Sequence, residues 1–215
     1  MSTQHSITFF HSPHTRASST LILLEELGVP YELRVLNMKA GEQRQPTYLA
    51  VNPLGKVPAI VDGATIVTEQ VAIFIHLADR FPEAGLAPSL DDPRRGAYLR
   101  WLVYYAACFE PALVDRSLGR DPGPAMSSPY GDFDAMIGVI DAQLQRSPYL
   151  LGDTMSAADV LWGSALVWGM AFAGVPRLPA LVEYAGRMAA RPASKRVAER
   201  DNAWIAEHEA ALAVA

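Results

Sequence analysis

Cysteine is almost absent from this sequence of 215 residues, in which Cys108 is the only one. No disulfide can therefore form within the chain, and no group of cysteines can hold a metal, so we expect no metal cofactor. The first residues, Met1–His5, lack the basic and apolar segments of a signal peptide. These absences together predict a protein of a reducing, cytoplasmic compartment.

Long apolar runs and clusters of positive charge are also missing. The longest uncharged stretch, Val160–Val175, is shorter than the ~20 residues of a membrane-spanning helix, and Asp159 and Arg177 flank it. The formal net charge is −5 without a dense group of Lys or Arg, which argues against nucleic acid or a membrane as partner. Half of the residues are hydrophobic and 19% are charged, as expected for a globular protein with a large core.

Strand and helix patterns alternate over residues 1–82. The first three runs, which read as strand, helix and strand, are Ile7–Phe10, Arg16–Leu27 and Tyr31–Leu36. A hairpin follows, with Asp62-Gly63 between Pro58–Val61 and Thr65–Val67, and then a helix that carries apolar residues over Val71–Ala78. The order βαβ followed by ββα predicts a small α/β domain whose first two strands are parallel.

Only helical patterns follow residue 91. Three apolar stripes with helical spacing lie at Tyr98–Tyr105, Phe133–Leu144 and Leu161–Phe172. A segment with Gly85 and Pro88, residues 83–93, reads as a linker. We therefore predict two domains, an α/β domain over residues 1–82 and an all-α domain over residues 94–215.

Three segments carry a resemblance to a known family. Asn52–Ile60 (NPLGKVPAI), Thr68–Ile73 (TEQVAI) and Ser156–Asp159 (SAAD) resemble the cytosolic glutathione transferases. The resemblance implies a thioredoxin-like N-terminal domain that binds glutathione and a helical C-terminal domain with the pocket for a hydrophobic second substrate. It also implies a homodimer and a role in detoxification. Ser156–Asp159 reads independently as a capping box, which is a folding signal.

The Val57-Pro58 pair is the centre of the glutathione site that the resemblance implies. In the family the bond before this proline is cis, and Val57 offers its N–H and C=O to the cysteinyl part of glutathione, as an added strand does. Lys56 would reach the glycyl carboxylate. Taken alone, Val-Pro would read as an ordinary trans proline at the start of a strand, because only about 5% of X–Pro bonds are cis.

Glu69 and Gln70 would bind the γ-glutamyl end of glutathione. They lie in the first turn of a helix for which Thr68 is the expected N-cap, and free N–H groups there favour an anion. Glu69 would pair with the ammonium group, or else only complement the helix dipole. Gln70 would help to hold the carboxylate, although the family usually has serine at this place.

Ser12 is the candidate for the group that activates the sulfur. It precedes Arg16 by four positions, as a serine does in the theta-, phi- and delta-type enzymes. The tyrosine-type classes do not fit because no tyrosine precedes Tyr31, and the beta type does not fit because arginine stands where that class has cysteine. Ser12 could otherwise be a simple turn residue. Its rivals at the sulfur are His11, His14, Thr15, Arg16 and Ser18.

The pocket for the second substrate is predicted on the first long helix of the C-terminal domain. Tyr104, Tyr105 and Cys108 are its candidates, although aromatics at this spacing also suit a core. The two tyrosines point in different directions on a helix, so we expect only one of them to face a pocket.

The leading function is a glutathione S-transferase that uses the thiolate to attack apolar electrophiles. A glutathione-dependent reductase or peroxidase on the same fold would need a cysteine near residues 12–16, where none exists. A non-catalytic binding or regulatory protein would have kept the fold without the chemistry.

Overall fold

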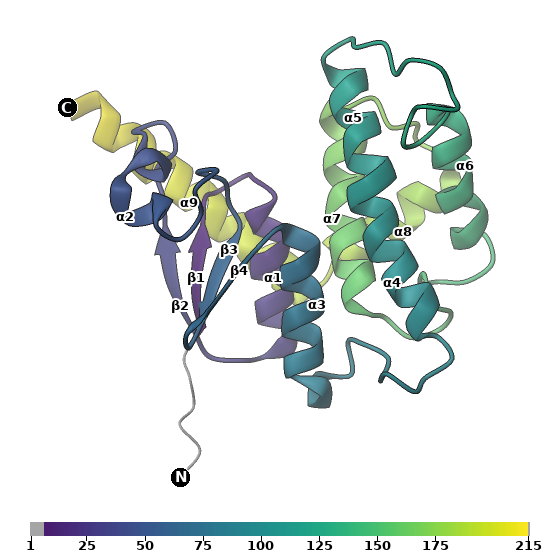
Figure 1. The fold of residues 1–215 in the computed structure, drawn as a ribbon, viewed down its shortest axis with the longest axis horizontal. Helices are drawn as coiled ribbons and strands as arrows, with labels where there is room; N and C mark the ends of the chain where they lie inside the picture. Colours follow the sequence, from purple (N-terminus) through teal and green to yellow (C-terminus); the bar gives the residue numbers. More distant parts are fainter. Residues whose placement is uncertain (1–6, 215) are drawn as a thin grey trace. The chain divides into compact units, whose positions relative to one another are not determined.

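The computed structural model describes residues 7–214 and shows two compact units (Figure 1). The first unit contains the chain up to Ala84 and again from Pro192, and the second is Gly85–Arg191. This division differs from the expected one at the C-terminus, because the last helix, α9 (Pro192–Val214), packs against the first helix of the first unit. The helical half of the sequence therefore does not form one body.

A four-stranded sheet lies at the centre of the first unit, in the order β2-β1-β3-β4. Its strands are β1 (Ile7–His11), β2 (Tyr31–Val35), β3 (Ala59–Asp62) and β4 (Thr65–Thr68). β1 and β2 are parallel, and β3 is antiparallel to both β1 and β4. The predicted thioredoxin-like order is confirmed, and the Asp62-Gly63 turn joins β3 to β4 as expected.

Two helices, α1 and α3, contact the strands of the sheet and bury apolar side chains. The helices of the first part of the chain are α1 (Ala17–Leu27), η1 (Glu42–Arg44), α2 (Pro46–Leu49), α3 (Gln70–Arg80) and η2 (Pro82–Ala84). α1 contacts both α3 and α9. It ends where predicted, at Gly28, whose φ of 67° is left-handed and whose N–H bonds to the Leu24 carbonyl at 3.2 Å.

The second unit is entirely helical in its regular structure. Its elements are α4 (Arg95–Tyr104), the π-helical turn η3 (Tyr105–Phe109), α5 (Glu110–Ser117), α6 (Phe133–Leu144), α7 (Ala157–Phe172) and α8 (Pro179–Ala189). Trp162 of α7 is fully buried and is ringed by aromatic side chains of α4 and η3. The predicted buried helix is therefore α7.

The capping box at the start of α7 is confirmed. The Asp159 carboxylate accepts hydrogen bonds from the Ser156 N–H and hydroxyl, both at 2.8 Å, and from the Leu150 N–H at 2.8 Å. The hydroxyl of Tyr184 in α8 donates to it at 3.0 Å. This carboxylate thus fixes both the helix start and a neighbouring helix.

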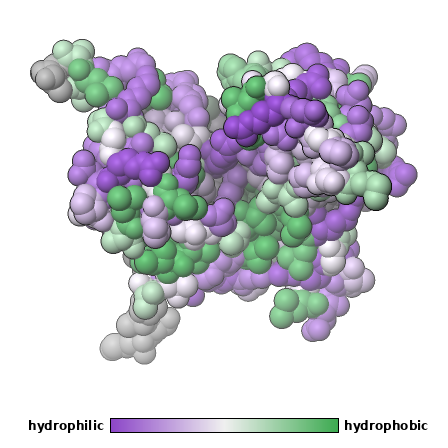
Figure 2. All heavy atoms as spheres, turned by 45° about the horizontal axis from the view of Figure 1, so that its top comes forward, coloured by the Kyte–Doolittle hydropathy of each residue, from purple (hydrophilic) through white to green (hydrophobic). Residues whose placement is uncertain are grey.

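Apolar side chains reach the surface in patches between polar ones (Figure 2). The aromatic rings of Trp168 and Phe172 near the end of α7 are exposed examples. Within residues 7–214, no helix combines the length and the apolar character needed to cross a membrane.

Candidate functional site

The sheet register brings three of the predicted segments to one end of the sheet. Phe10 pairs with Ala59, and Ala59 pairs with Thr68. Ser12 follows Phe10 by two residues, Val57 precedes Ala59 by two, and Glu69 directly follows Thr68. Ser12, Val57 and Glu69 therefore lie at the same end of the sheet. They are the candidates for activating the sulfur, binding the glutathione backbone and binding its ammonium group.

Ser12 lies in the loop between β1 and α1 and is only 4% exposed. In the described part of the chain its hydroxyl makes no hydrogen bond, whereas its backbone carbonyl accepts one from the Thr15 hydroxyl at 2.7 Å. Of the side chains named for the sulfur in this loop, Ser12 thus offers a hydroxyl hydrogen that no neighbour uses.

The hydroxyls of the rival residues Thr15 and Ser18 already donate to other acceptors. Thr15 gives its hydrogen to the Ser12 carbonyl and accepts one from the Ala17 N–H at 3.2 Å, so it links the Ser12 backbone to the first residue of α1. Ser18 donates to a carboxylate oxygen of Asp201 at 2.5 Å. A hydroxyl has a single hydrogen to donate, so neither can also hold a thiolate without breaking these bonds.

The other rivals also have structural partners. His11 is completely buried, and its Nε2 lies 2.7 Å from Asp201. The His14 ring, on a residue with φ of 53°, bonds to the Asn202 side chain at 3.0 Å. The backbone carbonyl of Arg16 accepts hydrogen bonds from Ser19 and Gln70. These interactions order the loop around Ser12.

The Asp201 carboxylate also contacts this loop, which the sequence did not indicate. It comes from α9 and accepts from His11, Ser18 and the His14 N–H. Burial raises the pKa of Asp201, but the hydrogen bonds from His11 and Ser18 outweigh it and keep the pKa below its usual range. No local pattern signals this role, because Asp201 is 183–190 residues away from these partners.

The Val57-Pro58 peptide bond is cis, as expected. Among residues 7–214, neither the N–H nor the C=O of Val57 has a hydrogen-bond partner, so both remain available to a ligand backbone. The preceding carbonyl, that of Lys56, is held by the Tyr48 hydroxyl and by the Asn52 side chain, the latter at 2.8 Å. Burial raises the pKa of Tyr48 to about 12, so its phenol stays a donor at neutral pH.

Gly55 gives this loop its shape. Its φ of 61° is left-handed, and a Cβ there would lie 2.9 Å from the Gln43 carbonyl oxygen. The glycine of the predicted motif is therefore needed for backbone geometry next to Lys56. The side chain of Lys56 itself is exposed.

The start of α3 differs from the prediction. The helix begins at Gln70 with Glu69 as its N-cap, and not with Thr68, because Thr68 is still paired in β4. Glu69 has a φ of 65°, and its side chain is exposed. No other described residue binds its carboxylate, which is free to meet an ammonium group.

The side-chain amide of Gln70 donates to partners within the first unit. Its Nε2 donates to the Ser19 hydroxyl at 2.6 Å and to the Arg16 carbonyl at 2.9 Å. In this arrangement Gln70 joins α3 to the start of α1, and its expected contact with a glutathione carboxylate stays a prediction.

The predicted pocket residues of the second unit separate into two groups. Tyr105 is 4% exposed, donates to Glu110 at 2.6 Å and packs on Phe109, so it belongs to the core. Tyr104 and Cys108 are half-buried. The Tyr104 hydroxyl donates to the Met136 carbonyl, and the Cys108 thiol to that of Pro129. Burial raises the pKa of the Cys108 thiol, which disfavours its reactive thiolate form.

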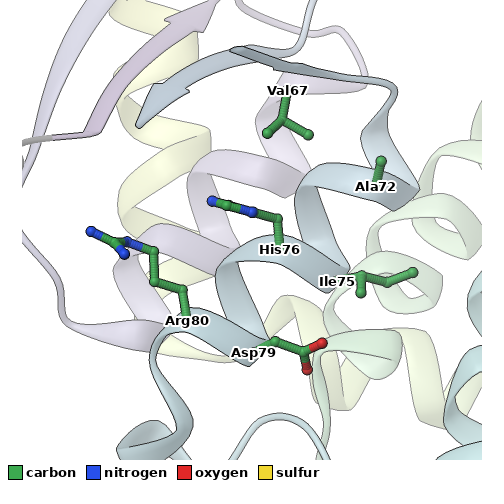
Figure 3. Close-up of a pocket in the computed structure, with 6 residues that line it drawn as sticks. All are labelled: Val67, Ala72, Ile75, His76, Asp79 and Arg80. Carbon is green, nitrogen blue, oxygen red and sulfur yellow. The ribbon is translucent and has the colours of Figure 1, made fainter. Parts of the chain in front are cut away.

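A surface hollow of about 750 Å³ lies elsewhere on the first unit, between β4 and α3 (Figure 3). Its lining consists of Val67, Ala72, Ile75, His76, Asp79 and Arg80. His76 and Arg80 both bind the Asp62 carboxylate, at 2.9 and 2.8 Å. None of the predicted glutathione contacts lines this hollow. Over the described range, no cluster of His, Cys, Asp and Glu could hold a metal.

The chain is similar in sequence to known proteins. Residues 5–79 match the family model "Glutathione S-transferase, N-terminal domain". Glutathione S-transferase F9 of Arabidopsis thaliana is 32% identical over 163 residues, which cover 70% of this chain and 75% of that protein. Disulfide-bond oxidoreductase YfcG of Escherichia coli is 26% identical over 202 residues, 87% of this chain and 92% of that protein.

Solved structures extend the similarity to both units. A sphingomonad glutathione S-transferase complexed with glutathione shares 28% identity and a TM-score of 0.76, covering 91% of this chain and 98% of that one. A glutathione transferase homologue from sulfitobacter with bound glutathione has 26% sequence identity and a TM-score of 0.75. The similarity again covers 91% of this chain and 98% of that one.

Proposed function

The chain belongs to the glutathione S-transferase family, and we propose that Ser12 activates the thiol of glutathione for conjugation to apolar electrophiles. In this reaction the thiol proton leaves to solvent and the Ser12 hydroxyl donates its hydrogen to the thiolate. The sulfur then forms a bond to the electrophilic carbon as a leaving group departs. The observation that carries the assignment is the unpaired hydroxyl of Ser12 beside Thr15 and Ser18, whose hydroxyl hydrogens already have acceptors.

In this proposal, three residues at the same end of the sheet bind glutathione. The free N–H and C=O of Val57 pair with the cysteinyl backbone in the manner of an added strand. The exposed Glu69 carboxylate takes the ammonium of the γ-glutamyl end, and Lys56 takes the glycyl carboxylate. The N–H groups of the first turn of α3 attract the γ-glutamyl carboxylate.

The energy required of Ser12 is modest. A free thiol with a pKa of about 8.5 is only a few per cent ionised at neutral pH, and lowering that pKa by two units takes about 2.7 kcal/mol. One hydrogen bond to a charged group supplies roughly 1.5–3 kcal/mol, and a helix N-terminus such as that of α1 adds roughly 0.3–1 kcal/mol. The remaining rate enhancement comes from holding the two substrates together.

The finer features of the function follow from the same assignment. We place the hydrophobic substrate against Tyr104 and Cys108, the half-buried pair of the second unit. Tyr105 is excluded by its burial. We also propose a cytoplasmic homodimer, which light scattering on the purified protein would reveal as twice the mass of the chain.

Replacing Ser12 by alanine tests the mechanism. We expect turnover of an activated aryl halide to fall about ten- to a hundredfold, with a rise of about one to two units in the pKa of bound glutathione. The ultraviolet absorbance of the thiolate against pH measures that pKa. Retention on immobilised glutathione should be unchanged, because Val57, Lys56 and Glu69 remain.

Thr15→Ala is the matched control, since it removes the neighbouring hydroxyl. We expect it to lower the free energy of unfolding by about 1 kcal/mol through the two lost hydrogen bonds and to lower turnover no more than about threefold, because the Ser12 hydroxyl remains. A thiol pKa that stays constant in Ser12→Ala but rises in Thr15→Ala would transfer the role to Thr15. Peroxide or disulfide turnover without conjugation would identify a reductase instead, and binding without any turnover a non-catalytic protein.

A further inference from the structure

The Asp201 carboxylate holds the chain on both sides of Ser12. Its Oδ1 accepts from Nε2 of His11, the residue before Ser12, at 2.7 Å. Its Oδ2 accepts from the N–H of His14 at 3.1 Å and from the Ser18 hydroxyl at 2.5 Å. An ionised carboxylate only accepts hydrogen bonds, so the three donors are matched to its chemistry. The Ser12 side chain lies between these bonded residues and does not bind the carboxylate.

Two more residues of α9 contact the same loop. The ring of Trp204, one turn after Asp201, lies 5.3 Å from the His11 ring, and the Asn202 side chain bonds to the His14 ring at 3.0 Å. His14 adopts the left-handed φ of 53° while its N–H bonds to Asp201. This conformation is unfavourable for a residue with a Cβ and persists where surrounding contacts hold it.

A second anchor of α9 is independent of the loop. Arg196 bonds to Glu25 of α1 at 3.0 and 3.2 Å, and Arg200 bonds to Glu25 and to the Tyr31 hydroxyl, each at 3.1 Å. These ion pairs hold α9 on the first unit without touching residues 11–18. Asp201 is consequently not needed merely to dock the helix.

We propose that Asp201 is a positioning residue for catalysis, which fixes the His11–Ser18 loop so that the Ser12 hydroxyl meets the glutathione sulfur. The proposal rests on the function assigned to Ser12. The helix α9 thereby sets the geometry of the His11–Ser18 loop. The Asp201 side chain, 2% exposed, does not itself bind a substrate.

The physical reason is that a hydrogen bond to a thiolate depends steeply on distance and angle. A loop that is free to sample other conformations loses part of the stabilisation of the thiolate, even with Ser12 present. Asparagine at position 201 keeps one acceptor oxygen but turns the other into a donor. A neutral amide also lacks the charge that strengthens the hydrogen bonds from His11, His14 and Ser18, so the restraint on the loop weakens.

The test compares Asp201→Asn with wild type, with Ser12→Ala and with the double variant. We expect Asp201→Asn to lower kcat about tenfold and to raise the pKa of bound glutathione by about one unit, with KM for glutathione changed less than about threefold. In the Ser12→Ala background the same substitution should shift that pKa by less than about 0.3 unit, because the two residues act as one.

Arg196→Ala is the matched control, since it weakens the other anchor of α9. It should leave the thiol pKa and kcat unchanged. An equal shift in Arg196→Ala, or an undiminished shift in the Ser12→Ala background, would overturn the role of Asp201. A constant thiol pKa in folded Asp201→Asn would overturn it as well.

Ser18→Ala keeps the test decisive if Asp201→Asn does not fold. It removes one donor to the carboxylate and should lower kcat about threefold with a matching rise in thiol pKa. An unchanged pKa in this variant contradicts the proposal. The failure of the proposed function is seen separately, as a Ser12→Ala variant that conjugates like wild type.

Discussion

Two buried aspartates, one in each unit, show how the same side chain serves different ends. Asp159 accepts four hydrogen bonds at the start of α7, and Asp201 accepts three beneath the Ser12 loop. Burial raises the pKa of Asp159 above its usual range, whereas the donors around Asp201 outweigh burial and lower its pKa. The first carboxylate defines the start of a core helix, and the second reaches a loop that carries chemistry.

The difference lies in the origin of the donors. Ser156, which supplies two of the four donors to Asp159, is three residues away, so the interaction forms as the helix does. All donors to Asp201 come from the opposite end of the chain. A local contact can stabilise an element, but only a long-range contact can place one element relative to another.

The largest expected effect is the loss of stability on replacing Asp159 by alanine. The buried donors of Leu150, Ser156 and Tyr184 would lose their acceptor, which should lower the free energy of unfolding by about 4 kcal/mol. Urea unfolding measures the change. Asp153→Ala, an exposed aspartate in the same loop, is the control and should stay within about 0.5 kcal/mol of wild type. Equal losses in both variants would refute the role of Asp159.

Two glycines, one in each unit, extend the comparison, and we expect an intermediate loss of stability when either is replaced. Gly55→Ala and Gly163→Ala should each cost about 1–3 kcal/mol of stability. A Cβ at Gly55 would meet the Gln43 carbonyl at 2.9 Å, and one at Gly163 would meet the Met188 Cβ at 2.4 Å. Only Gly55→Ala should also raise KM for glutathione, because it displaces the loop of Lys56 and Val57.

Gly138→Ala in α6 is the control for this pair, because a Cβ there meets nothing within 4 Å. It should stabilise the helix by about 0.5–1 kcal/mol. A rise in KM for glutathione in Gly163→Ala, without one in Gly55→Ala, would contradict the separation of folding and binding roles.

The smallest expected effect is on how stability depends on pH, to which Asp201 and Asp159 contribute in opposite directions. The lowered pKa of Asp201 means that its contribution is complete above the unfolded value of 3.8 and is lost as the pH falls through the folded pKa. The raised pKa of Asp159 acts in reverse: protonation below its folded pKa relieves the buried charge, so stability falls as pH rises through that value.

We compare the free energy of unfolding of each neutral variant with that of wild type between about pH 6 and about pH 3. The difference from wild type should change with pH in opposite directions for the two variants. Asp201→Asn should make the protein less sensitive to acid, and Asp159→Asn more sensitive. Identical pH profiles for the two variants would contradict the difference in pKa.

The sequence predicted the elements that depend on local signals. The alternation of Ile7–Phe10, the stop at Gly28 and the Asp62-Gly63 turn gave the order of the thioredoxin-like unit. The capping box at Ser156 gave the start of α7. It predicted less well where two local signals compete, as at Thr68, which continues β4 and leaves Glu69 as the N-cap of α3.

By itself, then, the sequence determined the order of the elements, the cis Val57-Pro58 turn by resemblance, and Ser12 as the candidate hydroxyl. The tertiary structure decided which side chains are free to act. It assigns Thr15 and Ser18 to other partners, ties Gln70 to α1, buries Tyr105 and brings Asp201 under the loop of Ser12. The reason is physical: the sequence lists each donor and acceptor, but only the folded chain shows which of them already have a partner.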